Sequence, residues 1–272
     1  MAKLGTYENR CFLSGRVAGV YRMKKNEVVL ALLVGRTRRQ NGKTVHVRTE
    51  DGKVRSDLYS VHFFDGAAKI VEERYQAGDF VNVNAVAMTI RDRYTCSNKI
   101  ELWGIRVSPK ASNGRLTPDL AQTDLAGTVV STYSGRSRAG RDYTSLTVYV
   151  NVTEQVVRPD GTVGPQDYHT YLTVGVNGER TRAIAKELKK GDWVHVYGRI
   201  RERKQESTGH KQDFLDVFFV ENLNAPVLHE EEPEEDHSAE DPVSNISNGN
   251  PIYSDGFIEV PRPTRRHVES EV

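Results

Sequence analysis

The chain has 272 residues, 37% hydrophobic and 28% charged, so it can form one large domain or two small ones with a modest apolar core. Its two cysteines, Cys11 and Cys96, lack metal-ligand spacing and argue against a disulfide scaffold, which favours a reducing compartment. The N-terminus lacks the apolar core of a signal peptide and no apolar run reaches membrane-spanning length, so we expect a cytoplasmic protein.

The net charge of +1 conceals a split along the chain. Residues 1–225 hold 35 lysines and arginines against 25 acidic residues, a net charge of +10. Residues 226–272 hold 3 against 12, a net charge of −9. The basic body suits a polyanion, and the acidic tail should repel one.

Short apolar or alternating runs bounded by turn residues predict a strand-rich body. In chain order, these strands are expected at residues 11–17, 28–34, 58–64, 79–88, 125–130, 145–152, 170–176, 193–200 and 214–220. Only residues 66–77 and 179–190 have a helical pattern. Each precedes a Gly-Asp pair, and glycine suits a helix C-terminus.

The body is an internal repeat. LSGRVAGVY (13–21) matches LAGTVVSTY (125–133), and the distance from Gly15 to Gly78 is 63 residues against 64 from Gly127 to Gly191. A period near 112 is too long for a solenoid, so it indicates two similar domains. Each unit runs strand, strand, strand, helix, strand, strand.

That order is typical of the OB-fold, a five-stranded Greek-key barrel. We therefore expect an all-β protein with one short helix per repeat. Its parts are a first OB-fold (1–110), a linker (111–121), a second OB-fold (122–225) and a tail (226–272). Gly15, Gly127 and Gly198 would allow sharp bends in the barrel strands. The tail holds six of the ten prolines and has no helix or strand period, so we expect it to be disordered.

No enzyme motif stands out. The sequence has no phosphate-binding G-x-x-x-x-G-K-[ST] loop, no G-x-S-x-G nucleophile elbow and no H-E-x-x-H zinc motif. The eight histidines are scattered, and no pair has helical ligand spacing. We expect no catalytic site, no metal and no cofactor, although a site assembled from distant residues stays an alternative.

Basic residues gather in several loops, which suits a phosphate backbone. Residues 35–57 contain seven basic and three acidic residues and a hairpin-type Asp51-Gly52, so they suggest a projecting basic ribbon. Arg199, Arg201 and Arg203 alternate and should share one face of a strand. The candidates for binding phosphates are Arg36, Arg38, Arg39, Arg48, Arg91, Arg93, Arg136, Arg138, Arg199, Arg201, Arg203 and Lys204. The alternative is ordinary solubilising charge.

Single-stranded nucleic acid also needs flat side chains on which bases stack. Strand alternation turns Tyr149, Tyr171 and Phe64 away from the expected core, and Tyr94 lies at a ribbon tip. These four are the candidates for stacking, with cross-strand packing as the alternative. Trp103 and Trp193 are left open between packing and subunit contact.

These segments resemble the bacterial-type single-stranded DNA-binding proteins. The resemblance rests on LSGRV and LAGTV, on KKGDWVHVYGRIRERK (189–204) and on YSVHFFDGAAKIVEERYQAGDFV (59–81), and it covers roughly residues 9–108 and 122–224. It implies an OB-fold that binds single-stranded DNA without sequence preference, in assemblies of four OB-folds. A chain with two would then form a homodimer. In that family an acidic tail recruits replication and repair enzymes.

The chain departs from the family's pattern at several positions. Phe64 stands where a stacking phenylalanine is expected, but Leu58, His169 and Gln205 stand near expected tryptophans. The family's tail ends in an acidic run and Ile-Pro-Phe, whereas this chain ends RRHVESEV. The most similar segment of this chain is SDGFIEV, which makes Asp255, Phe257 and Ile258 candidates for binding a partner. A phage or plasmid version of the family would fit these departures, with the host cytoplasm or nucleoid as its location.

The sequence thus predicts a protein that binds and protects single-stranded DNA in replication, recombination or repair. Two alternatives stay open: an RNA-binding OB protein, and a protein-binding OB scaffold of a replication complex.

Overall fold

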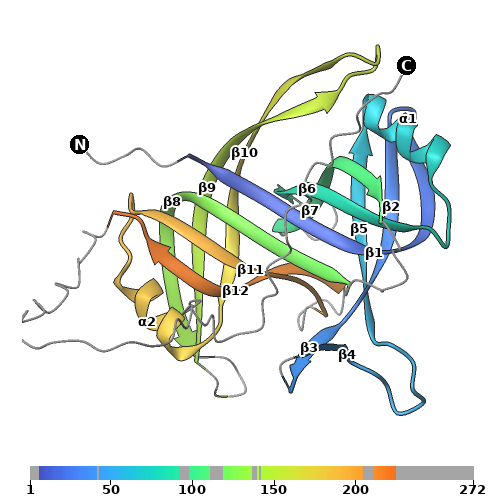
Figure 1. Ribbon diagram of the computed structural model, residues 1–272. Helices are drawn as coiled ribbons and strands as arrows, with labels where there is room; N and C mark the ends of the chain where they lie inside the picture. Colours follow the sequence, from blue (N-terminus) through green and yellow to red (C-terminus); the bar gives the residue numbers. More distant parts are fainter. Residues whose placement is uncertain are drawn as a thin grey trace, which may run out of the picture.

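The structure is a computed structural model, and it describes residues 6–41, 43–91, 98–110, 119–136, 140, 142–204 and 211–224. The predicted tail and most of the predicted linker lie outside these residues. Figure 1 shows two β-barrels side by side, each with one short helix. The boundaries chosen for the domains stay a prediction.

The first barrel is built from five strands and one helix. They are β1 (Glu8–Lys24), β2 (Glu27–Gly35), β5 (Ser56–Phe64), α1 (Asp65–Arg74), β6 (Phe80–Arg91) and β7 (Asn98–Pro109). Strand β1 pairs with both β2 and β6, and β6 pairs with β7, all antiparallel. A short parallel pairing of β5 with β7, Val61 opposite Leu102, closes the barrel.

The second barrel repeats this plan. Its elements are β8 (Leu120–Arg136), β9 (Asp142–Val157), β10 (Val163–Val176), α2 (Glu179–Glu187), β11 (Trp193–Lys204) and β12 (Lys211–Asn222). Strand β8 pairs with β9 and β11, and a parallel pairing of β10 with β12, Val176 opposite Val217, closes it. The expected tandem OB-fold is confirmed, and so is the repeat.

Burial along the strands follows the alternation read from the sequence. Leu146, Val148 and Val150 of β9 are fully buried, and Tyr59, Val61 and Phe63 of β5 are at most 1% exposed. Their neighbours on the other face are half-buried or exposed. The inward-facing side chains of both barrels join one continuous core.

Both helices end earlier than predicted, at Arg74 and Glu187, so the Gly-Asp glycines are not helix caps. The aspartates explain the difference. Asp79 accepts a hydrogen bond from the Gln76 backbone at 2.8 Å, and Asp192 does the same for Lys189, which forms a turn ahead of each glycine. Gly78 and Gly191 adopt φ of 103° and 96° within those turns, where a residue without a Cβ is favoured.

The strand glycines were expected to permit bends. Gly198 does lie at a register shift between β11 and β12. Gly15 and Gly127 instead lie where two strands approach closely, because a Cβ on either would overlap the carbonyl oxygen of Leu33 or Tyr149 on the next strand. In these barrels the glycines therefore serve close packing as well as curvature.

The two barrels are fused rather than merely linked. Strand β1 pairs with β8 over seven residues, from Glu8 opposite Ala126 to Ser14 opposite Leu120. A six-stranded antiparallel sheet thus runs through both barrels in the order β7-β6-β1-β8-β11-β12. The Tyr59 hydroxyl of the first barrel also donates to the Ile200 carbonyl of the second at 2.8 Å.

A second apolar cluster fills the space between the barrels. Its buried members are Val86 and Met88 of β6 with Val152 and Tyr168 of the second barrel, and Trp103 packs against them. Burial raises the pKa of Tyr168 to about 12, with a smaller contribution from Glu154 and Asp65. The barrels are therefore held together by side-chain packing as well as by the strand pairing.

The loops between the second and third strands differ sharply between the barrels. In the first barrel this loop forms a small ribbon of β3 (Thr37–Gln40) and β4 (Lys43–His46), which projects from the body in Figure 1. In the second barrel, β9 and β10 simply continue as a long hairpin. That hairpin packs on the start of α1, where a Cβ at Gly66 would overlap the Arg158 carbonyl oxygen.

Within the described part of the chain, neither helix has the length and apolar character needed to cross a membrane.

Candidate nucleic-acid interface

OB-folds bind oligonucleotides on the outer face of their second and third strands. In the second barrel these strands are β9 and β10, where Tyr149 pairs with Tyr171 across the sheet. Their ring centroids are 5.1 Å apart with planes at 47°, and Tyr171 is 57% exposed. The outward orientation predicted for both tyrosines is confirmed. An exposed ring at this place offers a flat surface to a base.

The tyrosine pair belongs to a longer aromatic row. The ring of Tyr7, from the segment before β1, lies 5.8 Å from Tyr149 and 4.5 Å from Trp193. Four rings therefore follow one another from β11 to β10: Trp193, Tyr7, Tyr149 and Tyr171. Sequence reasoning missed Tyr7 because it lies outside the repeat, and it left Trp193 unassigned.

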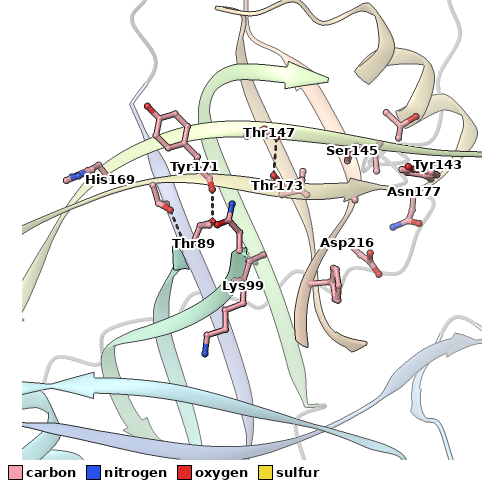
Figure 2. A pocket seen from close by; sticks show the side chains of 18 residues that line it. Thr89, Lys99, Tyr143, Ser145, Thr147, His169, Tyr171, Thr173, Asn177 and Asp216 are labelled. Carbon is pink, nitrogen blue, oxygen red and sulfur yellow. Dashed lines mark hydrogen bonds between the residues drawn. The ribbon is translucent and has the colours of Figure 1, made fainter. Parts of the chain in front are cut away.

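A polar groove begins beside Tyr171 (Figure 2). It has a volume of about 840 Å³ and lies between the β6–β7 ribbon of the first barrel and β9, β10 and β12 of the second. Thr89 bridges the two sides, since its hydroxyl donates to the Tyr171 carbonyl at 2.6 Å and its backbone N–H donates to Thr170 Oγ1 at 3.0 Å. Many of the lining residues carry a hydroxyl or amide group, among them Asn98, Ser145, Thr147, Thr173 and Asn177, and apolar side chains such as Ile100 and Phe214 lie between them.

Such a groove can hydrogen-bond base edges, sugars and phosphates with little sequence preference. Its lining contains a single lysine, Lys99, whose Nζ lies 3.1 Å from Glu101. No sequence pattern marked these threonines, serines and asparagines, because small polar residues are common on any strand face.

The same face of the first barrel is built differently. Leu33 pairs with Leu58 there, in the place where the second barrel has Tyr149 and Tyr171. Two equivalences fix that match. Gly15 approaches the Leu33 carbonyl as Gly127 approaches the Tyr149 carbonyl. In the parallel pairings that close the barrels, His62 lies opposite Trp103 as Gly175 lies opposite Asp216. The first barrel therefore offers aliphatic rather than aromatic side chains at this position.

Phe64 lies at the end of this face and is half-buried. Its ring makes an edge contact with Trp103 at 5.1 Å, and Trp103 in turn contacts Tyr168 at 6.1 Å. This packing corresponds to the alternative considered for the aromatic candidates. A stacking role for Phe64 stays a prediction.

Two arginines of β11 lie on one face, as the alternation predicted. The guanidinium groups of Arg199 and Arg201 lie 5.6 and 5.8 Å from the centre of the same ring, Phe218. Burial lowers the pKa of Arg199, and the neighbouring charge of Arg201 lowers it further. Arg201 Nε also lies 3.5 Å from the buried carboxylate of Asp216. Two cations held this close favour an anionic ligand across them.

The basic ribbon predicted at residues 35–57 is present. Arg38 and Lys43 are exposed, and Arg48 donates to the Gly52 carbonyl at 2.6 Å, beside the predicted Asp51-Gly52 turn. Arg36 has a structural role, because its Nε lies 2.9 and 3.0 Å from the two carboxylate oxygens of Asp57 at the root of the ribbon. That pairing makes Arg36 an anchor of the ribbon.

Two further arginine candidates are exposed. Arg91 ends β6, and Arg136 ends β8 with its Nε 3.1 Å from Asp142. Near Arg136, Tyr133 and Tyr143 form an exposed pair with centroids 5.7 Å apart, which sequence reasoning missed. A signal was available, since Tyr133 repeats Tyr21 in the matching segments.

The remaining candidates lie outside what the structure describes. They are Arg93, Tyr94, Arg138, Asp255, Phe257 and Ile258, together with the side chains of Arg39, Arg203 and Lys204. Their proposed roles stay predictions.

Among the described residues, one group has the composition of a metal site. Ligand atoms of Glu8, Asp124 and His195 lie within 4.8 Å of one another at the junction of the barrels. They are already paired, however: His195 Nε2 lies 2.5 Å from Asp124, and Glu8 lies 3.0 Å from Arg10. The hydrogen bond to Asp124 raises the pKa of His195, burial opposes this, and the charges of Asp124, Glu8 and Glu221 add to it. The group is an ion-pair network.

No family model matches the sequence, and no curated protein matches it. Solved structures do. The crystal structure of the wild-type single-stranded DNA-binding protein from Thermus aquaticus gives a TM-score of 0.53 at 16% identity, over 80% of this chain and 94% of that one. A deletion variant of the same protein gives 0.54 at 17% identity, over 83% and 99%.

This chain has the fold of that single-stranded DNA-binding protein. The match includes both barrels, because each alone is less than half of the chain. The resemblance drawn from the sequence is thereby confirmed at the level of the fold. At identities of 16% and 17%, the likeness shows the fold alone, so the argument about function rests on the side chains.

Proposed function

We propose that this protein binds single-stranded DNA without sequence preference. The observation that carries the proposal is the Tyr149–Tyr171 pair, which lies on the binding face of an OB barrel and borders a polar groove. The Thermus aquaticus protein, whose fold this chain shares, is named for the same activity.

The proposed mechanism combines stacking with charge. Every base has a π-face, so stacking on Tyr171 is tolerant of sequence. The hydroxyl and amide groups of the groove hydrogen-bond whatever lies beside them. Arg199 and Arg201 would neutralise phosphates and release their counterions, which makes the affinity dependent on salt.

We further propose that the protein protects exposed strands during replication, recombination or repair, in the cytoplasm, and acts as a binding protein rather than an enzyme. Two chains in a homodimer would bring four barrels to one strand. The acidic tail would compete for the basic surfaces and would bind replication or repair proteins, with Asp255, Phe257 and Ile258 as contacts. The charges of body and tail, +10 and −9, support the competition.

The test is fluorescence anisotropy of a labelled oligo-dT of about 30 nucleotides, at about 50 mM and about 200 mM salt. Tight binding that weakens with salt and resists competition by oligo-U supports the proposal. Equal competition by oligo-U would indicate RNA binding. Absence of binding at low salt would rule out both and leave a protein-binding scaffold.

A further inference from the structure

The two barrels differ in where they carry aromatic rings and where they carry positive charge. The Tyr149–Tyr171 pair lies on the second barrel, beside the groove that this barrel forms with the β6–β7 ribbon, whereas the matching face of the first barrel has Leu33 and Leu58. Positive charge, in contrast, is concentrated in the first barrel, in the loop between its second and third strands. Residues 36–55 of the first barrel hold seven basic and two acidic residues, and residues 153–167 of the second hold one and three.

The loop of the first barrel has regular secondary structure. In the β3–β4 ribbon, Arg38 pairs with Val45 and Gln40 with Lys43. Arg38, Gln40 and Lys43 therefore share one face, and a hydrogen bond of 3.4 Å from Arg38 to Gln40 agrees with this. The face consists of two exposed cations and an amide, together with the half-buried Val45.

The root of the ribbon is held firmly. The Arg36–Asp57 ion pair spans it on the side of the first barrel. On the other side, Asp119 at the start of the second barrel accepts from the Gly35 backbone at 2.8 Å and from Lys110 Nζ at 2.9 Å. Because the ribbon is tied to both barrels, its direction is set relative to the groove.

The ribbon lacks what a single strand requires. Residues 36–55 contain no phenylalanine, tyrosine or tryptophan, so bases have no ring to stack on. Without rings for stacking, binding by the ribbon depends on its positive charge, so it should be tightest where phosphates are most dense. A duplex carries one charge per about 1.7 Å of its axis, roughly twice the density of one strand. A two-stranded β-ribbon also fits the major groove of a duplex.

We propose that the β3–β4 ribbon binds duplex DNA, and that the whole chain binds the junction where a duplex opens into a single strand. The β3–β4 ribbon lies on the phosphates of the duplex, and the groove between the β6–β7 ribbon and the second barrel holds the strand that leaves it. The inference rests on the proposed function for the groove and adds a separate site for a different form of the nucleic acid.

The test compares three labelled ligands by anisotropy at about 50 mM and about 200 mM salt: oligo-dT, a blunt duplex, and a duplex with an oligo-dT tail of the same length as the free strand. The full-length protein is compared with the double variant Arg38→Gln/Lys43→Gln. A matched control, Arg180→Gln/Lys186→Gln, removes two exposed cations from α2 and gives the same change of charge.

We expect the tailed duplex to bind the unchanged protein about 10-fold more tightly than oligo-dT. The ribbon variant should lose most of this difference, reduce the dependence of log affinity on log salt by about two units for the tailed duplex, and change oligo-dT affinity less than about twofold. The control variant should keep the preference for the tailed duplex.

Two results would overturn the inference. One is equal affinity of the unchanged protein for the tailed duplex and for oligo-dT. The other is an equal loss on both ligands in the ribbon variant, which would make the ribbon part of the single-strand path. Failure of the proposed function looks different, because the unchanged protein would then not bind oligo-dT at all.

Discussion

Tyr171 is the side chain on which the proposed stacking depends most, because it is exposed, lies on the binding face and borders the groove. Tyr149 supports it from the next strand. The hydroxyl of Tyr171 is not needed for stacking. Base stacking on an aromatic ring is worth about 1–3 kcal/mol per base. We therefore expect Tyr171→Ala to weaken binding of oligo-dT by about 5- to 150-fold, and Tyr171→Phe to bind nearly as well as the unchanged protein.

Anisotropy titrations of both variants check this prediction. Phe219→Ala serves as the control, since Phe219 is another exposed ring, 42% accessible, on β12 and outside the groove lining. A similar loss in Tyr171→Ala and Phe219→Ala would point to a general effect on the fold, and unchanged affinity in Tyr171→Ala would remove Tyr171 from the binding surface.

His195 makes stability depend on pH at the junction of the barrels. Its hydrogen bond to Asp124 raises its pKa, with further support from the charges of Glu8 and Glu221, against the effect of burial. A group whose pKa is higher in the folded state binds its proton more tightly there. The stabilisation is complete below the unfolded pKa of about 6.5 and is lost as pH rises through the folded pKa.

We expect the free energy of unfolding to fall as pH rises through that range, by more in the unchanged protein than in His195→Gln. Urea denaturation between about pH 5.5 and pH 9 measures this difference. The comparison isolates His195 from the other seven histidines. Parallel pH profiles for the two proteins would show that the His195–Asp124 pair does not contribute.

At the scale of elements, the strands and their faces could be predicted because alternation decides which side chains are buried. Leu146, Val148 and Val150 behave as the period of two requires. The helix ends could not be predicted from the helical period, because the Asp79 and Asp192 side chains terminate each helix through their own hydrogen bonds.

The candidate site was recovered only in part, and for a physical reason. Tyr149 and Tyr171 face outward within their own strands, so local alternation locates them. Tyr7 and Thr89 join the site through contacts between the barrels, which depend on the β1–β8 pairing and on the packing of β6 against β10. Local periodicity carries no information about such distant partners.

The difference between the barrels leads to a prediction about the first one. Leu58 is 45% exposed and stands where the second barrel has Tyr171. Leu58→Tyr would add a ring on a second binding face, so we expect oligo-dT affinity to rise about threefold or more. Leu223→Tyr is the control, because Leu223 is similarly exposed, at 44%, but lies after β12 and away from this face.

Anisotropy at one salt concentration suffices to compare the two tyrosine variants. A gain confined to Leu58→Tyr would show that the strand passes over the first barrel as well as the second. If neither variant binds more tightly, the single strand follows the second barrel alone.

At the scale of the whole molecule, the opposite charges of body and tail set up a competition. Residues 226–272 carry a net charge of −9 and the rest of the chain +10, so the tail is attracted to the same cationic surfaces that would bind DNA. Deleting residues 226–272 should therefore raise oligo-dT affinity at low salt. The screening length is about 10 Å at 0.1 M salt, so the gain should shrink as salt increases.

The deletion is compared with a full-length variant in which the acidic residues of HEEEPEED (229–236) are changed to glutamine and asparagine. Both proteins should bind oligo-dT several-fold more tightly than the unchanged chain at low salt. The deletion removes the net charge of −9, and the second variant removes six of the twelve acidic charges while it keeps the length of the tail. A gain in the deletion alone would assign the effect to the bulk of the tail. Unchanged affinity in both would exclude competition by the tail and leave its acidic residues free to bind a partner protein.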